Sequence, residues 1–258
     1  MSDASDATTP GYRAGFGLEM LADASSLTGG EFAYRQLFDA ILARRLLPGA
    51  RLQEVALASL FGVGRTAVRQ ALLRLEQIGV VESHANRGSQ VTAPAADAVA
   101  GIVDARRVIE GALLERTIGR LRDGRIEPAV FEPLGALARE EGEHLAGGRD
   151  GVAQRLGCEQ HLALADLAAH PALAASLGRL VPQTALAVTV YARTSSSYCG
   201  WRSRLALFDV VARGEKAAAL AALGAHFDAL EASLDTGGIA SGDPLARAFD
   251  GLPVHRRG

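Results

Sequence analysis

The chain has 258 residues, of which 48% are hydrophobic and 22% are charged, and its formal net charge is −2. This balance fits a globular protein with one large or two ordinary domains, and it excludes an intrinsically disordered chain. Two cysteines are too few for a disulfide framework, which indicates a reducing, cytoplasmic environment. No basic segment leads into an apolar one at the N-terminus, and no window of about 18 uninterrupted apolar residues occurs, so we expect no secretion and no membrane span.

The charge is distributed unevenly along the chain. Residues 31–93 hold eight arginines and five acidic residues, a net charge of +3, which leaves −5 for the rest of the chain. A basic segment joined to an acidic one predicts a module that faces a polyanion, attached to a partner module.

The first part of the chain predicts three helices and a two-stranded hairpin. Residues 1–30 are rich in small and polar residues and are expected to form a flexible tail. The apolar periodicity that begins at Glu31, and the glycine punctuation after it, then predict a first helix, helices over 54–60 and 65–77, and strands over 80–83 and 89–92. The hairpin turn falls at 86–88.

The second part predicts a helical domain. Residues 94–96 form a linker, residues 97–236 the helical domain, and residues 237–258 a C-terminal tail. Within the domain, apolar periodicity predicts helices over 97–122, 131–146, 151–168, 171–194, 200–213 and 216–235. The fold class is therefore mainly α, with an N-terminal winged helix-turn-helix over 31–93 and a C-terminal antiparallel all-α bundle.

The winged helix-turn-helix pattern carries candidate DNA contacts. Val68, Ala71, Leu72 and Leu75 share the inward face of the helix over 65–77, and the opposite face projects two arginines one turn apart. Guanidinium groups at the start of such a helix can hold guanine or phosphate in a major groove, and an arginine at the wing suits the minor groove. The predicted DNA-binding residues are Arg65, Thr66, Arg69, Gln70, Arg87 and Gly88.

Several motifs in this module resemble the DNA-binding domain of the GntR family of bacterial regulators. They are Leu47-Pro48-Gly49-Ala50-Arg51-Leu52, Gly62-Val63-Gly64-Arg65-Thr66-Ala67-Val68-Arg69-Gln70-Ala71-Leu72 and Gly79-Val80-Val81. The family usually has Ser or Thr at Gly64 and Glu at Gln70, so the resemblance predicts the module but not the operator sequence.

The helical half resembles the FCD effector domain of one GntR subfamily, in the segments 104–110, 159–164 and 225–227. Together the two resemblances cover residues 31–235. They imply a helical bundle around a polar cavity, a homodimer, and control of DNA binding by a small molecule.

Many FCD domains hold a divalent metal through one Asp and three His, and this chain matches that set only in part. His161 and His226 match two of the histidines, whereas Gly157 and Arg204 stand at the other two positions and cannot ligate a metal. No metal is therefore favoured. Cys158 lies three residues before His161 and offers an alternative zinc-type site of Cys158, His161 and His226.

The same positions predict an anion site without a metal. Arg204 would take the place of the metal and pair with a carboxylate effector, helped by Arg106. An alternative for Arg106 is an ion pair with Glu110 one turn away. In the helix over 171–194, which Pro182 is expected to kink or interrupt, Gln183, Thr184 and Tyr191 share an arc that can line the cavity. The predicted effector-binding residues are Arg106, His161, Gln183, Tyr191, Arg204 and His226.

These features predict a transcription factor rather than an enzyme, since no nucleophile–base motif or phosphate-binding loop is present in the sequence. We expect a homodimeric repressor that binds a short inverted repeat of double-stranded DNA and that a small organic acid releases. The alternative is a ligand-independent or metal-dependent regulator with a vestigial or Cys/His site.

Overall fold

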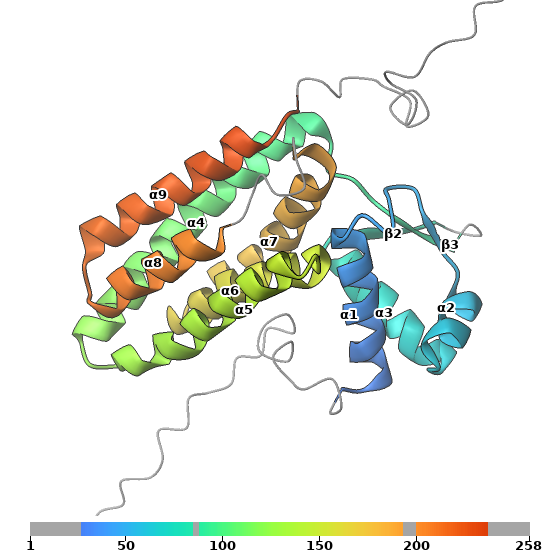
Figure 1. The fold of residues 1–258 in the computed structure, drawn as a ribbon, viewed down its shortest axis with the longest axis horizontal. Coiled ribbons are helices and arrows are strands. Elements are labelled where there is room, and N and C mark those ends of the chain that lie inside the picture. The colour runs from blue at the N-terminus through green and yellow to red at the C-terminus, as the bar shows by residue number, and fades with distance from the viewer. Residues whose placement is uncertain (1–26, 85–87, 193–199, 237–258) are drawn as a thin grey trace, which may run out of the picture.

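The computed structural model describes residues 27–84, 88–192 and 200–236. In this part of the chain, helices predominate, and a small antiparallel sheet lies in the N-terminal third (Figure 1). Residues 86 and 87 of the predicted hairpin turn, Arg87 among them, most of the N-terminal tail and the whole C-terminal tail lie outside the described residues.

The N-terminal module has the winged helix-turn-helix order of elements. Its elements are α1 (Gly29–Leu42), β1 (Arg51–Leu52), α2 (Glu54–Phe61), α3 (Arg65–Gln77), β2 (Val81–His84) and β3 (Gly88–Val91). The sheet order is β1-β3-β2, and β3 pairs antiparallel with both neighbours, with Gln90 opposite Glu82 and Arg51. The predicted inward face of α3 is confirmed, because Val68, Ala71, Leu72 and Leu75 are all buried.

Helix α1 begins two residues before the predicted start. Thr28 caps it: the Thr28 side chain accepts a hydrogen bond from the Glu31 amide, and the Glu31 carboxylate accepts one from the Thr28 amide. This reciprocal capping box satisfies amides that the first helical turn leaves unpaired, so Gly29 and Gly30 are helical rather than part of the tail.

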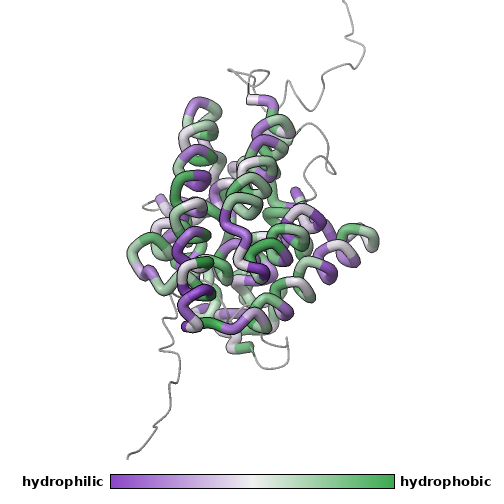
Figure 2. Tube along the Cα trace, turned by 90° about the vertical axis from the view of Figure 1, so that its left-hand side faces the viewer, coloured by the Kyte–Doolittle hydropathy of each residue, from purple (hydrophilic) through white to green (hydrophobic). Residues whose placement is uncertain are grey.

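The helical domain is a bundle of long helices. They are α4 (Ala96–Arg122), α5 (Glu132–Ala146), α6 (Asp150–Leu167), α7 (Pro171–Tyr191), α8 (Trp201–Ala212) and α9 (Lys216–Ser233), with a short 3-10 helix at Pro128–Phe131. Polar and apolar residues alternate along these helices (Figure 2), and the apolar ones build a core that includes Leu114, Phe208 and Phe227.

Helix α7 is long and apolar enough to cross a membrane by length and composition, but 56% of its most apolar window is buried inside the protein. It packs against α4 and α6, which is the position of a core helix. The helix also runs through the buried Pro182 without interruption, so of the two predicted alternatives, a kink or a break, the break is wrong.

The two modules share a packed boundary. Helix α1 lies against α6 and α7 (Figure 1), and α1, Cys158 and Leu186 belong to one apolar cluster. The packing is close, because a Cβ placed on Gly151 of α6 would lie 2.1 Å from the carbonyl oxygen of Asp39 in α1. The helices of the second module therefore contact the N-terminal module directly.

Candidate DNA-binding surface and effector pocket

The outer face of α3 presents the predicted DNA contacts to solvent. Arg65, Thr66, Arg69 and Gln70 are all exposed there, at the N-terminal half of the helix. Gly88, at the start of β3, has a φ of 76°, a left-handed conformation that glycine adopts readily. Helix and wing thus lie as they do in a winged helix-turn-helix module, with a face free to meet a duplex.

Arg69 has a partner that the sequence analysis did not identify. Its Nε and Nη2 donate to the two carboxylate oxygens of Glu54 in α2, at 3.1 and 3.0 Å. The Arg69 side chain is nevertheless 62% exposed. The pair joins the two helices of the helix-turn-helix, and a phosphate or base that takes the same edge of this guanidinium must compete with Glu54.

Polar side chains converge on a cavity inside the helical bundle. Arg106 of α4, Gly157 and His161 of α6, Thr184 of α7 and Arg204 of α8 line it, and Val181, Ala185 and Val188 form its apolar wall. The cavity volume is about 40 Å³, which has room for about three water molecules. An organic effector therefore requires some of the lining side chains to move.

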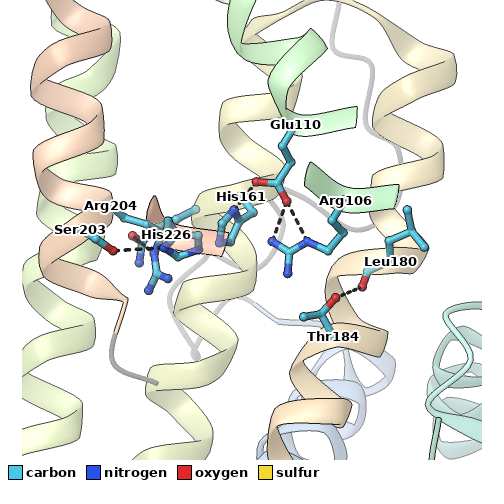
Figure 3. A network of polar contacts seen from close by, with 9 residues as sticks. Arg106, Glu110, His161, Leu180, Thr184, Ser203, Arg204 and His226 are labelled. Carbon is cyan, nitrogen blue, oxygen red and sulfur yellow. Dashed lines mark hydrogen bonds and ion pairs between the residues drawn. The ribbon is translucent and has the colours of Figure 1, made fainter. Parts of the chain in front are cut away.

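The buried Arg106 forms the predicted ion pair with Glu110. Its Nε donates to Glu110 Oε1 at 2.8 Å, and its Nη2 lies 2.6 Å from the same oxygen (Figure 3). Burial opposes ionisation of this carboxyl, but Arg106 and His161 outweigh it and lower the Glu110 pKa to about 2. Glu110 is thus a permanent anion beside the cavity.

His161 completes this cluster from α6. Its Nδ1 lies 2.7 Å from Glu110 Oε2 (Figure 3). Burial lowers the His161 pKa to about 4, so the neutral ring donates its Nδ1–H to Glu110 and keeps Nε2 as an acceptor. The His226 ring lies 5.1 Å from it, centroid to centroid, and burial lowers the His226 pKa well below its usual value.

Arg204 points into the bundle and is 97% buried, although its helix begins only three residues earlier. It forms an ion pair with Glu141 of α5, and its Nε donates to Gln160 Oε1 at 3.0 Å. Two guanidinium groups and two carboxylates therefore balance each other at the cavity, where the sequence analysis expected excess positive charge.

Two predicted effector residues lie away from this cavity. Gln183 turns toward the DNA-facing module, where its Nε2 would lie 2.6 Å from a Cβ on Gly79, at the end of α3. The Tyr191 hydroxyl donates to the carbonyl oxygen of Pro94 in the linker, at 2.7 Å. Both side chains follow the expected arc of α7, but that arc spans the domain boundary as well as the cavity.

The residues at the cavity do not fit a metal ion. Among the described residues, no group of three or more His, Cys, Asp or Glu side chains gathers in a way that could hold one. Burial raises the Cys158 pKa to about 12, so in the metal-free protein this residue is a thiol. Gly157 offers no donor atom, and the Arg204 cation lies against it.

The N-terminal module is similar to a known family of proteins. Residues 30–91 match the family model of bacterial regulatory proteins of the gntR family. An uncharacterised HTH-type transcriptional regulator in an unstable DNA locus of Streptomyces ambofaciens is 32% identical over 118 residues, which are 44% of this chain and 46% of that protein. The aligned part of the chain spans about half the length of that relative.

Solved structures share the fold of both modules. A Rhodococcus sp. RHA1 structure assigned to GntR transcriptional regulators has a TM-score of 0.60 at 22% identity, covering 82% of this chain and 99% of its own. E. coli McbR/YncC has a TM-score of 0.63 at 18% identity, and the match covers 80% of this chain and 96% of that chain. The matched family is one of regulators, not enzymes. The helix-turn-helix module of this chain is therefore similar to the bacterial regulatory proteins of the gntR family.

Proposed function

We propose that the chain is a cytoplasmic transcriptional repressor that binds a short inverted repeat of double-stranded DNA as a homodimer. The observation that carries this proposal is the exposed face of α3, where Arg65, Thr66 and Arg69 stand together on a module that matches the gntR family. Two such faces in a two-fold dimer can enter successive major grooves.

Selection from a random duplex pool tests DNA binding with the full-length chain. The expected product is an inverted repeat bound by two chains, as measured by sedimentation of the complex. An Arg65→Ala, Arg69→Ala double variant should lose this enrichment and keep its fold, as judged by circular dichroism. Enrichment of unrelated sequences, or equal enrichment with the double variant, contradicts the placement of the DNA-binding surface.

We further propose that a small carboxylate enters the cavity and displaces Glu141 from Arg204. Exchange of one carboxylate for another leaves the buried guanidinium paired, and the displaced Glu141, which is itself buried, takes up a proton from solvent and so avoids becoming an isolated buried charge. Arg106 and the neutral His161 lie on the same cavity and can bind the remainder of the ligand. This proposal includes the FCD-like character of the helical domain, and it requires no bound metal.

A second function, ligand-independent regulation, is favoured by the internal balance of charge and by the small cavity volume. Thermal-shift measurements with sugar acids and aromatic acids separate the two. Under the first proposal at least one acid raises the melting temperature of the parent and releases selected DNA, and Arg204→Gln abolishes both effects. An unchanged melting temperature with every acid favours the ligand-independent regulator.

A further inference from the structure

A chain of ion pairs, buried except for the partly buried Asp39, crosses the boundary between the two modules. Arg155 of α6 donates through Nε to Asp39 of α1 at 2.7 Å, and through Nη1 to Glu159 of its own helix at 2.5 Å. Arg155 is 8% exposed and Glu159 is 3% exposed. One guanidinium thus serves two carboxylates, one from each module.

The backbone brings these groups together at one place. Gly151 lies one turn before Arg155 in α6. It is so close to the Asp39 carbonyl oxygen that the side chain of any larger residue would clash with this oxygen. The side-chain pair and the backbone contact therefore fall on the same residue of α1. Because α1 also packs against α3, this residue ties the helical domain to the element that supports the DNA-facing helix.

The Glu159 carboxylate is incompletely satisfied. Its Oε2 is buried and finds no hydrogen-bond donor among the described residues. A buried carboxylate oxygen without a donor favours the protonated acid, which is neutral. Burial accordingly raises the Glu159 pKa to about 7, against the opposing effect of Arg155 and Arg35.

The groups that face Glu159 come from two helices. Helix α1 contributes Tyr34, Arg35 and Asp39, and α6 contributes Arg155 and Cys158, while His144 of α5 faces Asp39. Asp39 opposes ionisation of Glu159, because the two carboxylates repel each other. When Glu159 takes up a proton, Arg155 is left to Asp39, and the pair across the boundary strengthens.

We propose that the Asp39–Arg155–Glu159 chain is a proton-responsive clasp, which holds the DNA-binding module against α6 more tightly at slightly acidic than at slightly alkaline pH. The direction follows from linkage. Separation of the modules would expose Glu159 to water and return its proton affinity toward that of a free glutamate, so the docked state binds the proton more tightly. The clasp depends on neither DNA nor effector, so it can fail while the proposed function stands.

The thiol of Cys158 offers a native probe of this boundary. Cys158 is buried in the apolar cluster that contains Tyr34 and Leu37 of α1. A Cys199→Ser background leaves it as the one thiol of the chain. The measured quantity is its rate of reaction with an aromatic disulfide reagent, divided at each pH by the rate for the unfolded chain, which removes the intrinsic pH dependence of thiols.

In the full-length protein, protection of Cys158 should be about tenfold greater near pH 6 than near pH 8, because one proton is linked to docking over this interval. Glu159→Gln mimics the protonated acid and should make protection nearly independent of pH. Asp166→Asn is the matched control: Asp166 lies on the same helix and burial raises its pKa to about 6, but it is not part of the clasp. This variant should keep the pH dependence.

Two further measurements make the test decisive. The side-chain carboxyl carbon of Glu159, assigned in ¹³C spectra by its loss in Glu159→Gln, should titrate with a midpoint near 7. The opening free energy for Cys158 should be smaller than that of global unfolding, taken from the slowest-exchanging amides. Equal opening energies, a flat parent profile, or a pH dependence that survives in Glu159→Gln would each overturn the clasp.

Discussion

The Arg204 guanidinium lies against the Cα of Gly157, so that a Cβ placed on this glycine would stand 3.0 Å from Arg204 Nη2 and 3.6 Å from Glu141 Oε1. The absence of a side chain at one position thus makes room for an ion pair anchored on two other helices. The packing of α5, α6 and α8 around the cavity depends on this match between a missing side chain and a large one.

Gly157→Ala should therefore destabilise the fold, by about 1–3 kcal/mol if the guanidinium cannot retreat. Gly119→Ala is the matched control, since Gly119 is also inside a long helix but has open space where a Cβ would stand. Alanine there should stabilise the fold by up to about 1 kcal/mol through helix propensity. Urea unfolding measures both, and a change of the same sign in the two variants would contradict the steric argument.

The double change Gly157→Asp with Arg204→His should create a zinc site. It removes a cation, adds a carboxylate and an imidazole, and leaves His161 and His226 in place, which gives four ligands of the type that zinc prefers. Equilibrium dialysis followed by elemental analysis should find about one zinc ion per chain. Stoichiometric zinc in the parent protein would show that the existing residues suffice and would defeat the arginine-based proposal.

Much of the fold follows from local patterns in the sequence. The helices over 65–77 and 96–122 start or end where periodicity and glycine or proline punctuation place them, because these signals lie within a few residues of each other. The ion pair of Arg106 with Glu110 likewise follows from the sequence, because the two residues are one helical turn apart. The predicted start of α1 is two residues too late, because two glycines follow Thr28 and the pattern does not indicate the capping box that Thr28 forms.

The charge balance of the cavity could not be predicted from the sequence, because it depends on contacts between residues that are far apart in the chain. Glu141 and Arg204 are 63 residues apart on different helices, and a single sequence carries no signal for that pairing. Gln183 shares the arc of Thr184, yet the end of α3 rather than the cavity faces it. Residue types and spacings identified the polar residues, but only the packing of the helices decides which charges meet.

Arg65→Ala should weaken binding of the selected duplex by about 1–3 kcal/mol if Arg65 contacts a base, and the loss should be specific to that sequence. If Arg65 contacts phosphate, binding to every duplex should weaken and its salt dependence should decrease. Fluorescence anisotropy at several salt concentrations distinguishes the two roles. Arg51→Ala, in β1 of the same module, is an exposed-arginine control. Unchanged binding by Arg65→Ala would remove this residue from the interface.

Glu54→Gln should strengthen DNA binding. Glu54 accepts hydrogen bonds from Nε and Nη2, one edge of the exposed Arg69 guanidinium, and adds a negative charge beside α3. The neutral amide competes less well for the guanidinium, so Arg69 is released to phosphate or base. The expected gain is a few-fold in affinity at low salt, because exposed ion pairs contribute about 1 kcal/mol or less. Weaker binding would indicate that Glu54 positions Arg69 for DNA instead of competing with it.

The stability of the protein should depend on pH through buried groups whose effects have opposite signs, and His161 and Glu159 are one such pair. The folded protein lowers the His161 pKa from 6.5 to about 4, so the unfolded chain binds the extra proton in this interval and acidification destabilises the fold. It raises the Glu159 pKa from 4.5 to about 7, so the folded protein binds the extra proton in that interval and acidification stabilises the fold. Between about pH 4.5 and 6.5 the two effects oppose each other.

Single variants should therefore show a pH dependence of the free energy of unfolding that cancels in the parent protein. In His161→Gln, where the amide can still donate to Glu110, the free energy of unfolding should rise as the pH falls from about 6.5 to 5, by up to about 1.4 kcal/mol per pH unit. In Glu159→Gln it should fall over the same interval by a similar amount. Urea titrations at closely spaced pH values measure both slopes. Each slope arises from one proton, and His226 and Asp166, whose pKa values burial shifts in opposite directions, remain in every variant. The double variant should therefore return to the shallow profile of the parent, and a steep profile in the double variant would contradict this balance.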